Sequence, residues 1–260
     1  MAKFETILFE KKGSVAWITL NRPDVRNAMS PQMREEIIEA VQDCREDNAV
    51  YVVAVTGAGE QAFCAGADIS QFLTATSADQ LARHSRVHPI HLIREMPKPV
   101  VAMVNGPAFG GGCELVLACD IAIASEKAQF GQLEVRVGII PGAGGTQILP
   151  RLIGDKRAKD LIFTGRVISA NEALQWGMVN QVVPHDKLRE TTEKYLASLC
   201  RKSPVILKLA KLSINRAHET ALSAGIASER DLFALCFSTE DQKEGARAFF
   251  EKRETNYKGK

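Results

Sequence analysis

A chain of 260 residues is long enough for one large domain, or one domain with a smaller appendage, and for a substantial buried core. Its net charge of only +2 excludes a strong general attraction to nucleic acid or to a membrane surface. No apolar run is long enough to span a bilayer, and residues 1–12 lack the apolar core of a signal peptide. We therefore expect neither a nucleic-acid partner nor a membrane partner.

The first half of the chain predicts alternating strands and helices. In chain order these are a hairpin with strands over residues 6–9 and 15–20, a helix beginning at Ser30-Pro31, a strand over 50–56, an irregular segment over 61–70, and a helix over 78–95 that Pro89 disturbs. The helix start at Ser30 is clear because serine is a favoured N-cap and proline a favoured first helical residue.

Residues 57–62, Gly-Ala-Gly-Glu-Gln-Ala, follow a predicted strand and fit the G-x-G-x-x-A fingerprint of dinucleotide-binding proteins. The context argues against that function, because residues 62–68 show no helical run that could receive a pyrophosphate. The chain also has no Gly-Lys-Ser/Thr after a glycine-rich loop and no G-x-S-x-G elbow. The sequence thus predicts no nucleotide cofactor, no P-loop and no serine-hydrolase nucleophile.

Residues 99–120 form the most informative stretch. An apolar run ending at Val104 predicts a buried strand, and Asn105-Gly106-Pro107 ends it. Three glycines at 110–112 come directly before an apolar helical run, whose first N–H groups lack partners within the helix. The unpartnered N–H groups of such a turn favour binding of an oxygen atom that carries negative charge. Glu114 lies in the first helical turn, which indicates proton transfer on a carbonyl compound.

The second half begins with further short elements and ends in helices alone. In chain order we expect strands over 121–124 and 128–130, a glycine-rich turn over 138–145 that leads into a helix from 146, a helix over 155–163, a capping box over 169–172 with a short helix closed by Gly177, and a strand over 179–183. Helices over 186–202, 204–218, 221–237 and 239–252 follow. The sequence predicts an α/β core over residues 1–195 and a helical region over 196–260.

The cysteines form no C-x-x-C pair and lie in apolar or helical contexts; they are Cys44, Cys64, Cys113, Cys119, Cys200 and Cys236. We therefore expect reduced thiols and a cytoplasmic location. His84, His88 and His91 have the spacing of one helical face, which makes zinc conceivable. Pro89 interrupts that face and no H-E-x-x-H pattern is present, so no metal site is predicted.

A second carboxylate, Glu134, follows Phe130-Gly131-Gln132-Leu133 and precedes the glycine-rich turn at residues 138–145. Alone, Glu114 or Glu134 is typical of a surface or capping carboxylate. Their combination with two glycine-rich turns is more specific, and it resembles the enoyl-CoA hydratase/isomerase (crotonase) family over nearly the whole chain. The motifs that carry the resemblance are Leu20-Asn21-Arg22-Pro23, Phe63-Cys64-Ala65-Gly66-Ala67-Asp68-Ile69, Asn105-Gly106 with Gly110-Gly111-Gly112-Cys113-Glu114, Phe130-Gly131-Gln132 with Glu134, and Pro141-Gly142-Ala143-Gly144-Gly145-Thr146.

The resemblance implies a crotonase-like spiral of ββα units whose C-terminal helices build a homotrimer, often stacked as a homohexamer. It implies an acyl-CoA thioester as substrate, with coenzyme A as part of the substrate and no separate cofactor. The backbone N–H groups of Ala67 and Gly111 correspond to the family's oxyanion hole. The residues expected to bind the substrate or its CoA are Arg26, Ala28, Ala65, Asp68, Ile69, Ser70 and Gly142.

The two acids determine which reaction the resemblance favours. An enolate develops on the thioester oxygen when water is added or removed, and two N–H donors stabilise it. Since both Glu114 and Glu134 match, we expect hydration of a 2-enoyl-CoA to a 3-hydroxyacyl-CoA. Glu134 would protonate the α-carbon, and Glu114 would orient and deprotonate the water. Leu133 departs from the proline that many hydratases carry there, which bears on acyl preference.

Two alternatives remain open at this point. An enoyl-CoA isomerase, or a dehydratase for an unusual acyl group, would carry the same oxyanion hole; assays of 3-enoyl-CoA against 2-enoyl-CoA distinguish it. A non-catalytic RNA-binding member of the family belongs to another class of protein. The two glutamates and the small net charge argue against it, and a salt-dependent RNA affinity would favour it.

Overall fold

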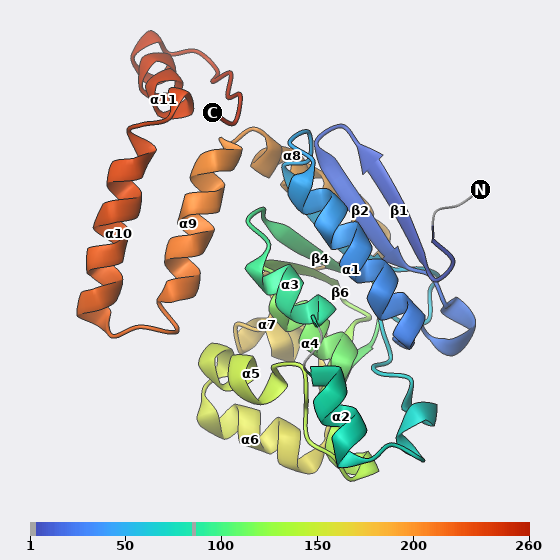
Figure 1. Ribbon diagram of the computed structural model, residues 1–260. Helices are drawn as coiled ribbons and strands as arrows, with labels where there is room; N and C mark the ends of the chain where they lie inside the picture. The colour runs from blue at the N-terminus through green and yellow to red at the C-terminus, as the bar shows by residue number, and fades with distance from the viewer. Residues whose placement is uncertain (1–3, 85–86) are drawn as a thin grey trace.

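The computed structural model describes residues 4–84 and 87–260, with the side chains of residues 71, 83 and 84 outside that description. The strands are β1 (Ile7–Lys12), β2 (Val15–Leu20), β3 (Val52–Gly57), β4 (Val100–Val104), β5 (Ala108–Phe109), β6 (Ile121–Ser125), β7 (Gln129–Gly131), β8 (Ile168–Ser169) and β9 (Gln181–Val183). The α-helices are α1 (Pro31–Glu46), α2 (Ser77–His84), α3 (Pro89–Glu95), α4 (Gly111–Ala118), α5 (Gly145–Ile153), α6 (Asp155–Thr164), α7 (Ala170–Gln175), α8 (Leu188–Cys200), α9 (Pro204–Arg216), α10 (Leu222–Cys236) and α11 (Glu240–Glu251) (Figure 1).

The main sheet has the order β1-β2-β3-β4-β6-β9 among the described residues. The predicted hairpin of β1 and β2 is antiparallel, and every later neighbour pairs in parallel. All residues of β3 and of β4 are buried, as expected for central parallel strands with both faces covered. A smaller sheet pairs β5 with β7 and β7 with β8. The turn after β4 leads directly into β5, so it joins the two sheets.

Helices cover both faces of the main sheet. On one face α1 buries Met33, Ile37 and Val41 in the larger core cluster, and its start is the predicted one, since Ser30 Oγ accepts a hydrogen bond from Met33 N at 3.1 Å. On the other face α8 contributes Leu188 and Leu196 to a smaller cluster with β2, β3 and β4. The boundary predicted at residue 195 falls within α8.

The helix predicted over residues 78–95 is two helices, α2 and α3, with an interruption before Pro89. Proline has no N–H to continue a preceding helix, and it disfavours helical backbone at the residue before it. His88 accordingly has extended backbone (φ −102°, ψ 131°), and its Nδ1 accepts a hydrogen bond from Ile90 N at 3.3 Å. Pro89 is therefore a helix start rather than a disturbance inside one helix.

Helices α9, α10 and α11 extend away from the sheet in Figure 1, with α9 and α10 side by side. Large apolar side chains on these helices are exposed to solvent, including Ile214, Leu222, Phe233, Phe249 and Phe250. Many large apolar side chains on an exposed surface are typical of a contact site, so this face is suited to an interface.

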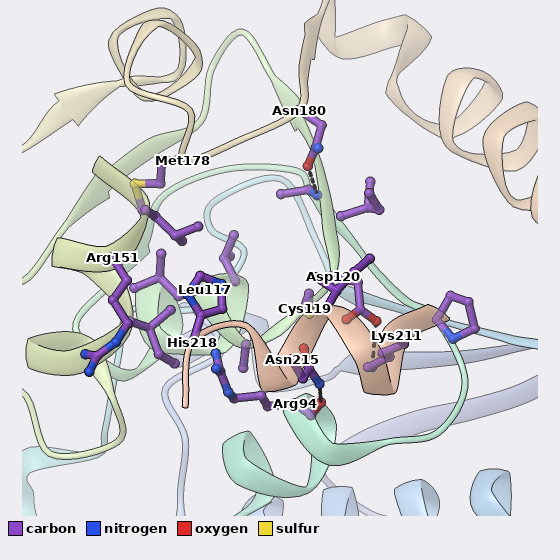
Figure 2. A pocket seen from close by; sticks show the side chains of 18 of the residues that line it. Arg94, Leu117, Cys119, Asp120, Arg151, Met178, Asn180, Lys211, Asn215 and His218 are labelled. Atoms are coloured by element: carbon purple, nitrogen blue, oxygen red, sulfur yellow. Dashed lines mark hydrogen bonds and ion pairs between the residues drawn. The ribbon is translucent and has the colours of Figure 1, made fainter. Parts of the chain in front are cut away.

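An ion pair between the buried Lys211 and the partly exposed Asp120 connects α9 to the body (Figure 2). Lys211 Nζ lies 2.7 Å from Asp120 Oδ2 and 3.2 Å from the carbonyl oxygen of Lys98, and Asp120 Oδ2 also accepts a hydrogen bond from Val100 N at 2.7 Å. The pair lines a cavity of about 430 Å³ between α9 and the C-terminal end of α4. Burial raises the pKa of Asp120, and the nearby Lys211 charge opposes that shift. The ion pair thus fixes α9 at the start of the central strand β4.

Lys211→Met is expected to destabilise the fold by about 1–3 kcal/mol, because it leaves the partly exposed Asp120 carboxylate without its cation. Chemical denaturation at pH 7.5 measures the effect. Lys208→Met is the matched control, since Lys208 is exposed on the same helix. Equal stability of the two variants would show that the ion pair contributes nothing net.

Candidate active site

The turn after β4 is held by Asn105, a largely buried side chain. Its Oδ1 accepts a hydrogen bond from Gly57 N at 3.2 Å, and its Nδ2 donates to the carbonyl oxygen of Gly59 at 2.9 Å. Asn105 therefore joins the ends of β3 and β4. Residues 58–76, between β3 and α2, are all described by the structure and contain no α-helix, so the segment matching the dinucleotide fingerprint lacks the helix that a pyrophosphate needs.

The glycines at the start of α4 allow another chain segment to approach closely. A Cβ on Gly112 would lie 2.2 Å from the carbonyl oxygen of Cys64, which no side chain can do. Gly110 has a φ of +50°, in the left-handed region that favours glycine. These two positions bring the segment after Cys64 against the N-terminus of α4.

This approach places the predicted oxyanion donors side by side. A Cβ on Gly111 would lie 3.6 Å from the backbone nitrogen of Ala67. The residues on either side of Ala67 are tied to Met29, because Met29 N donates to the carbonyl oxygen of Gly66 at 2.8 Å and Asp68 N donates to that of Met29 at 3.2 Å. Within residues 4–84 and 87–260, neither the Ala67 N–H nor the Gly111 N–H has a protein acceptor. Both N–H groups are free to bind one oxygen of a ligand.

Glu114 is a buried carboxylate, 3% exposed, at the first turn of α4. Its Oε1 accepts hydrogen bonds from Ala143 N at 2.7 Å and Gly145 N at 2.8 Å, both in the second glycine-rich turn. Burial raises the pKa of Glu114, and these two hydrogen bonds lower it in part. The bonds fix one oxygen of the carboxylate and leave Oε2 for other partners.

Glu134 is the first residue of the 3-10 helix Glu134–Val137 and is half-buried. Its Oε1 lies 3.1 Å from the position that a Cβ on Gly110 would occupy, so Glu134 faces the start of α4. Burial raises the pKa of Glu134 to about 7, and the charge of Glu114 acts in the same direction. A carboxyl group with this pKa can give or take a proton near neutral pH.

Glu134→Gln is expected to raise the free energy of unfolding by about 1–3 kcal/mol at pH 8, after allowance for partial exposure. The folded-state pKa of Glu134 is about 7 and the ordinary value is 4.5, so folding favours the protonated acid. The cost of burying the carboxylate is absent below pH 4.5, grows between pH 4.5 and 7, and is complete above pH 7. Denaturation of both proteins at pH 4.5 and pH 8 measures the difference; an equal gain at both pH values contradicts the assignment.

The residues expected to bind CoA lie around the loop that precedes the oxyanion donors. Arg26 has left-handed backbone, and its carbonyl oxygen accepts a hydrogen bond from Ala65 N at 2.9 Å. Arg26 and Ala65 also line a hollow together with Phe109 and Gln129. Arg22 Nη1 donates to the carbonyl oxygen of Ala28 at 2.7 Å. Arg26 and Ala65 therefore line one hollow, and Ala28 lies two residues further along the loop that contains Arg26.

The remaining predicted residues follow Ala67 in the chain or lie in the second glycine-rich turn. Asp68 caps the following 3-10 helix, and its Oδ1 accepts a hydrogen bond from Ser70 Oγ at 2.8 Å. Asp68, Ile69 and Ser70 are partly or largely exposed. Gly142 is exposed in the second glycine-rich turn, and it is Ala143 and Gly145 that donate to Glu114. These two donors were not predicted, although residues 141–146 indicated a turn of this kind.

Of the three histidines whose spacing made zinc conceivable, His88 and His91 have described side chains. The rings of His88 and His91 lie 5.4 Å apart, while the side chain of residue 84 is outside the description. No group of three histidine, cysteine, aspartate or glutamate side chains suited to a metal ion is found among the described residues. Nor does any described helix combine the length and apolar character of a membrane span.

Comparison with known proteins agrees with this geometry. The sequence profile of the enoyl-CoA hydratase/isomerase family matches residues 10–260. The chain is 43% identical over 256 residues to a crotonyl-CoA hydratase of Syntrophomonas wolfei, with 98% of each chain covered. It is 42% identical to a short-chain-enoyl-CoA hydratase of Clostridium acetobutylicum, with 96% of this chain and 97% of that protein covered.

Solved structures give the same result. The crystal structure of enoyl-CoA hydratase subunit I from Geobacillus kaustophilus superposes with a TM-score of 0.94 at 42% identity, covering 99% of this chain and 100% of that one. The chain belongs to the enoyl-CoA hydratase/isomerase family and has the crotonase fold. The predicted fold class is confirmed.

Proposed function

We propose that this protein catalyses the reversible addition of water to a 2-enoyl-CoA thioester, giving a 3-hydroxyacyl-CoA. One observation carries the proposal. Two free backbone N–H groups and two carboxylates with raised pKa values lie around the start of α4. The family match and the hydratases at 42–43% identity over nearly the full chain support the same hydro-lyase activity.

The proposed roles follow from what each group can donate or accept. The Ala67 and Gly111 N–H groups hold the thioester oxygen and stabilise the negative charge that develops there. Glu114 accepts a proton from water, whose oxygen forms a bond to the β-carbon. The carbon–carbon double bond shifts its electrons toward the thioester oxygen, and Glu134 then delivers a proton to the α-carbon. After hydration Glu114 holds the proton taken from water and Glu134 is ionised, and proton exchange with solvent restores both groups before the next turnover. The reverse sequence removes water.

The CoA part of the substrate is proposed to lie along Arg26, Ala28 and Ala65, next to the oxyanion donors. This placement is supported by the hollow that Arg26 and Ala65 share. The reaction as written needs no redox group or metal, and we propose that coenzyme A enters only as part of the substrate. Two relatives are named as a crotonyl-CoA hydratase and a short-chain-enoyl-CoA hydratase, so substrates with a short acyl chain should be tested first.

We further propose that residues 1–195 form the catalytic core and that residues 196–260 serve self-association as a homotrimer or homohexamer. The exposed apolar side chains of α10 and α11 support this division, because they would be covered by neighbouring copies. Light scattering after gel filtration measures the assembly. A cytoplasmic location is proposed as well, supported by cysteines that are all free thiols.

The test of the activity is an assay with crotonyl-CoA, longer 2-enoyl-CoAs and a 3-enoyl-CoA. Loss of the conjugated enoyl absorbance and formation of 3-hydroxyacyl-CoA support hydration. Turnover of the 3-enoyl-CoA to its 2-enoyl isomer, without hydration of any 2-enoyl-CoA, would instead establish the isomerase alternative.

A further inference from the structure

Gln132 is a fully buried polar side chain that neither gives nor takes a proton in the proposed reaction. It follows β7 and comes two residues before Glu134. Burying a side-chain amide is unfavourable unless both of its ends have hydrogen-bond partners, so the surroundings of this amide indicate what it does.

The amide lies between the two carboxylates. In the orientation that satisfies its surroundings, its NH₂ group donates to both Oε1 and Oε2 of Glu134, each at 3.1 Å. The same amide lies 2.9 Å from the position that a Cβ on Gly145 would occupy, and Glu114 Oε1 lies 3.0 Å from that position. One side chain therefore contacts Glu134 and reaches the turn that holds Glu114.

From this geometry we propose that Gln132 is a positioning residue that holds the Glu134 carboxylate for proton transfer to the α-carbon and eases release of its proton. The inference rests on the proposed hydration, in which Glu134 is the acid. A single NH₂ group that donates to both carboxylate oxygens restricts rotation of the carboxylate. An N–H donor also favours the ionised form, which must be left behind when the proton is given to carbon.

The hydrogen bonds from the Gln132 amide act on the pKa of Glu134 in the opposite direction to its other surroundings. Burial and the charge of Glu114 both favour the protonated acid and raise its pKa. The Gln132 donor acts in the opposite direction, so its removal raises that pKa further. Because hydration needs protonated Glu134, its rate falls as pH rises through this pKa. Removal of the donor therefore moves the alkaline limb of the pH profile to higher pH.

The experiment compares Gln132→Met and Gln132→Glu with the unchanged protein in crotonyl-CoA hydration from pH 5 to 10. Methionine has a similar length without donors, and glutamate keeps the shape but replaces the donor with an acidic oxygen. We expect kcat to fall about 10- to 100-fold with KM changed less than about 3-fold, since a hydrogen bond to a charged group is lost. In both variants the alkaline limb should move to higher pH. Gln175→Met, at an exposed amide on α7, is the control and should behave as the unchanged protein.

A second comparison separates positioning from a general loss of structure. In a Glu134→Gln background, Gln132→Met should lower the residual rate less than about 3-fold, because the two residues act as a unit. The same 10- to 100-fold loss in that background, or an unmoved alkaline limb in both Gln132 variants, would overturn the proposal. Absence of hydration by the unchanged protein would instead refute the proposed function itself.

Discussion

Glu114→Gln is expected to lower the rate of crotonyl-CoA hydration by about 10²- to 10⁴-fold, the range typical for loss of a general acid–base group. The glutamine side chain has the same shape, and its carbonyl oxygen can still accept the hydrogen bonds of Ala143 N and Gly145 N. The fold and the second glycine-rich turn should therefore remain. What is lost is the ability to take a proton from water. Initial rates at saturating crotonyl-CoA measure the effect.

Two controls make this result specific. Glu95→Gln, at an exposed glutamate on α3, should leave the rate unchanged. Binding of a saturated acyl-CoA to the Glu114→Gln variant should stay within a few-fold of the normal affinity, since the N–H pair is intact. Hydration at a normal rate by this variant would remove Glu114 from the water-activating role and transfer that role to Glu134.

Gly111→Ala is expected to lower hydration by about 10²- to 10³-fold, comparable to the loss of one oxyanion donor. The added Cβ would lie 3.6 Å from Ala67 N, an ordinary packing distance, so the protein should still fold. The methyl group would contact the Ala67 N–H, however, and would compete with the thioester oxygen for that donor. We therefore expect a thermal unfolding midpoint close to normal together with a large loss of kcat/KM.

The neighbouring glycine provides the contrast. Gly112→Ala would place a Cβ 2.2 Å from the carbonyl oxygen of Cys64, a distance that forces the two segments apart. This variant should lose stability as well as activity, whereas Gly111→Ala should lose activity alone. If Gly111→Ala hydrated crotonyl-CoA at the normal rate, the thioester oxygen would have to bind elsewhere.

The centre of the site could be predicted from the sequence because its signals are local. The strand ending at Val104, the glycines before α4 and Glu114 in its first turn are adjacent in the chain, and each has a direct effect on backbone geometry. Short-range patterns also predicted the hairpin and the start of α1. The separation of α2 and α3 was only indicated, since Pro89 could equally have bent one helix.

The partners of the two acids could not be predicted in the same way. Ala143 and Gly145 are close to Glu114 only because α4 and α5 pack together, about 30 residues apart in sequence. Gln132 is visible in the sequence only as part of a motif, and its contact with Glu134 depends on the direction of the chain after β7. The backbone donors Ala143 and Gly145 leave no side-chain signature, so only the tertiary fold reveals them.

The tight contact between Gly112 and Cys64 also makes the Cys64 thiol a natural probe. This thiol is fully buried, and burial raises its pKa to about 11, so it reacts slowly with alkylating or disulfide reagents while the contact is closed. A reagent can reach the sulfur only during moments when the loop and α4 separate. The speed of modification then reports how often the oxyanion pocket opens, and slowing by a tightly bound acyl-CoA would report how firmly a ligand keeps it shut.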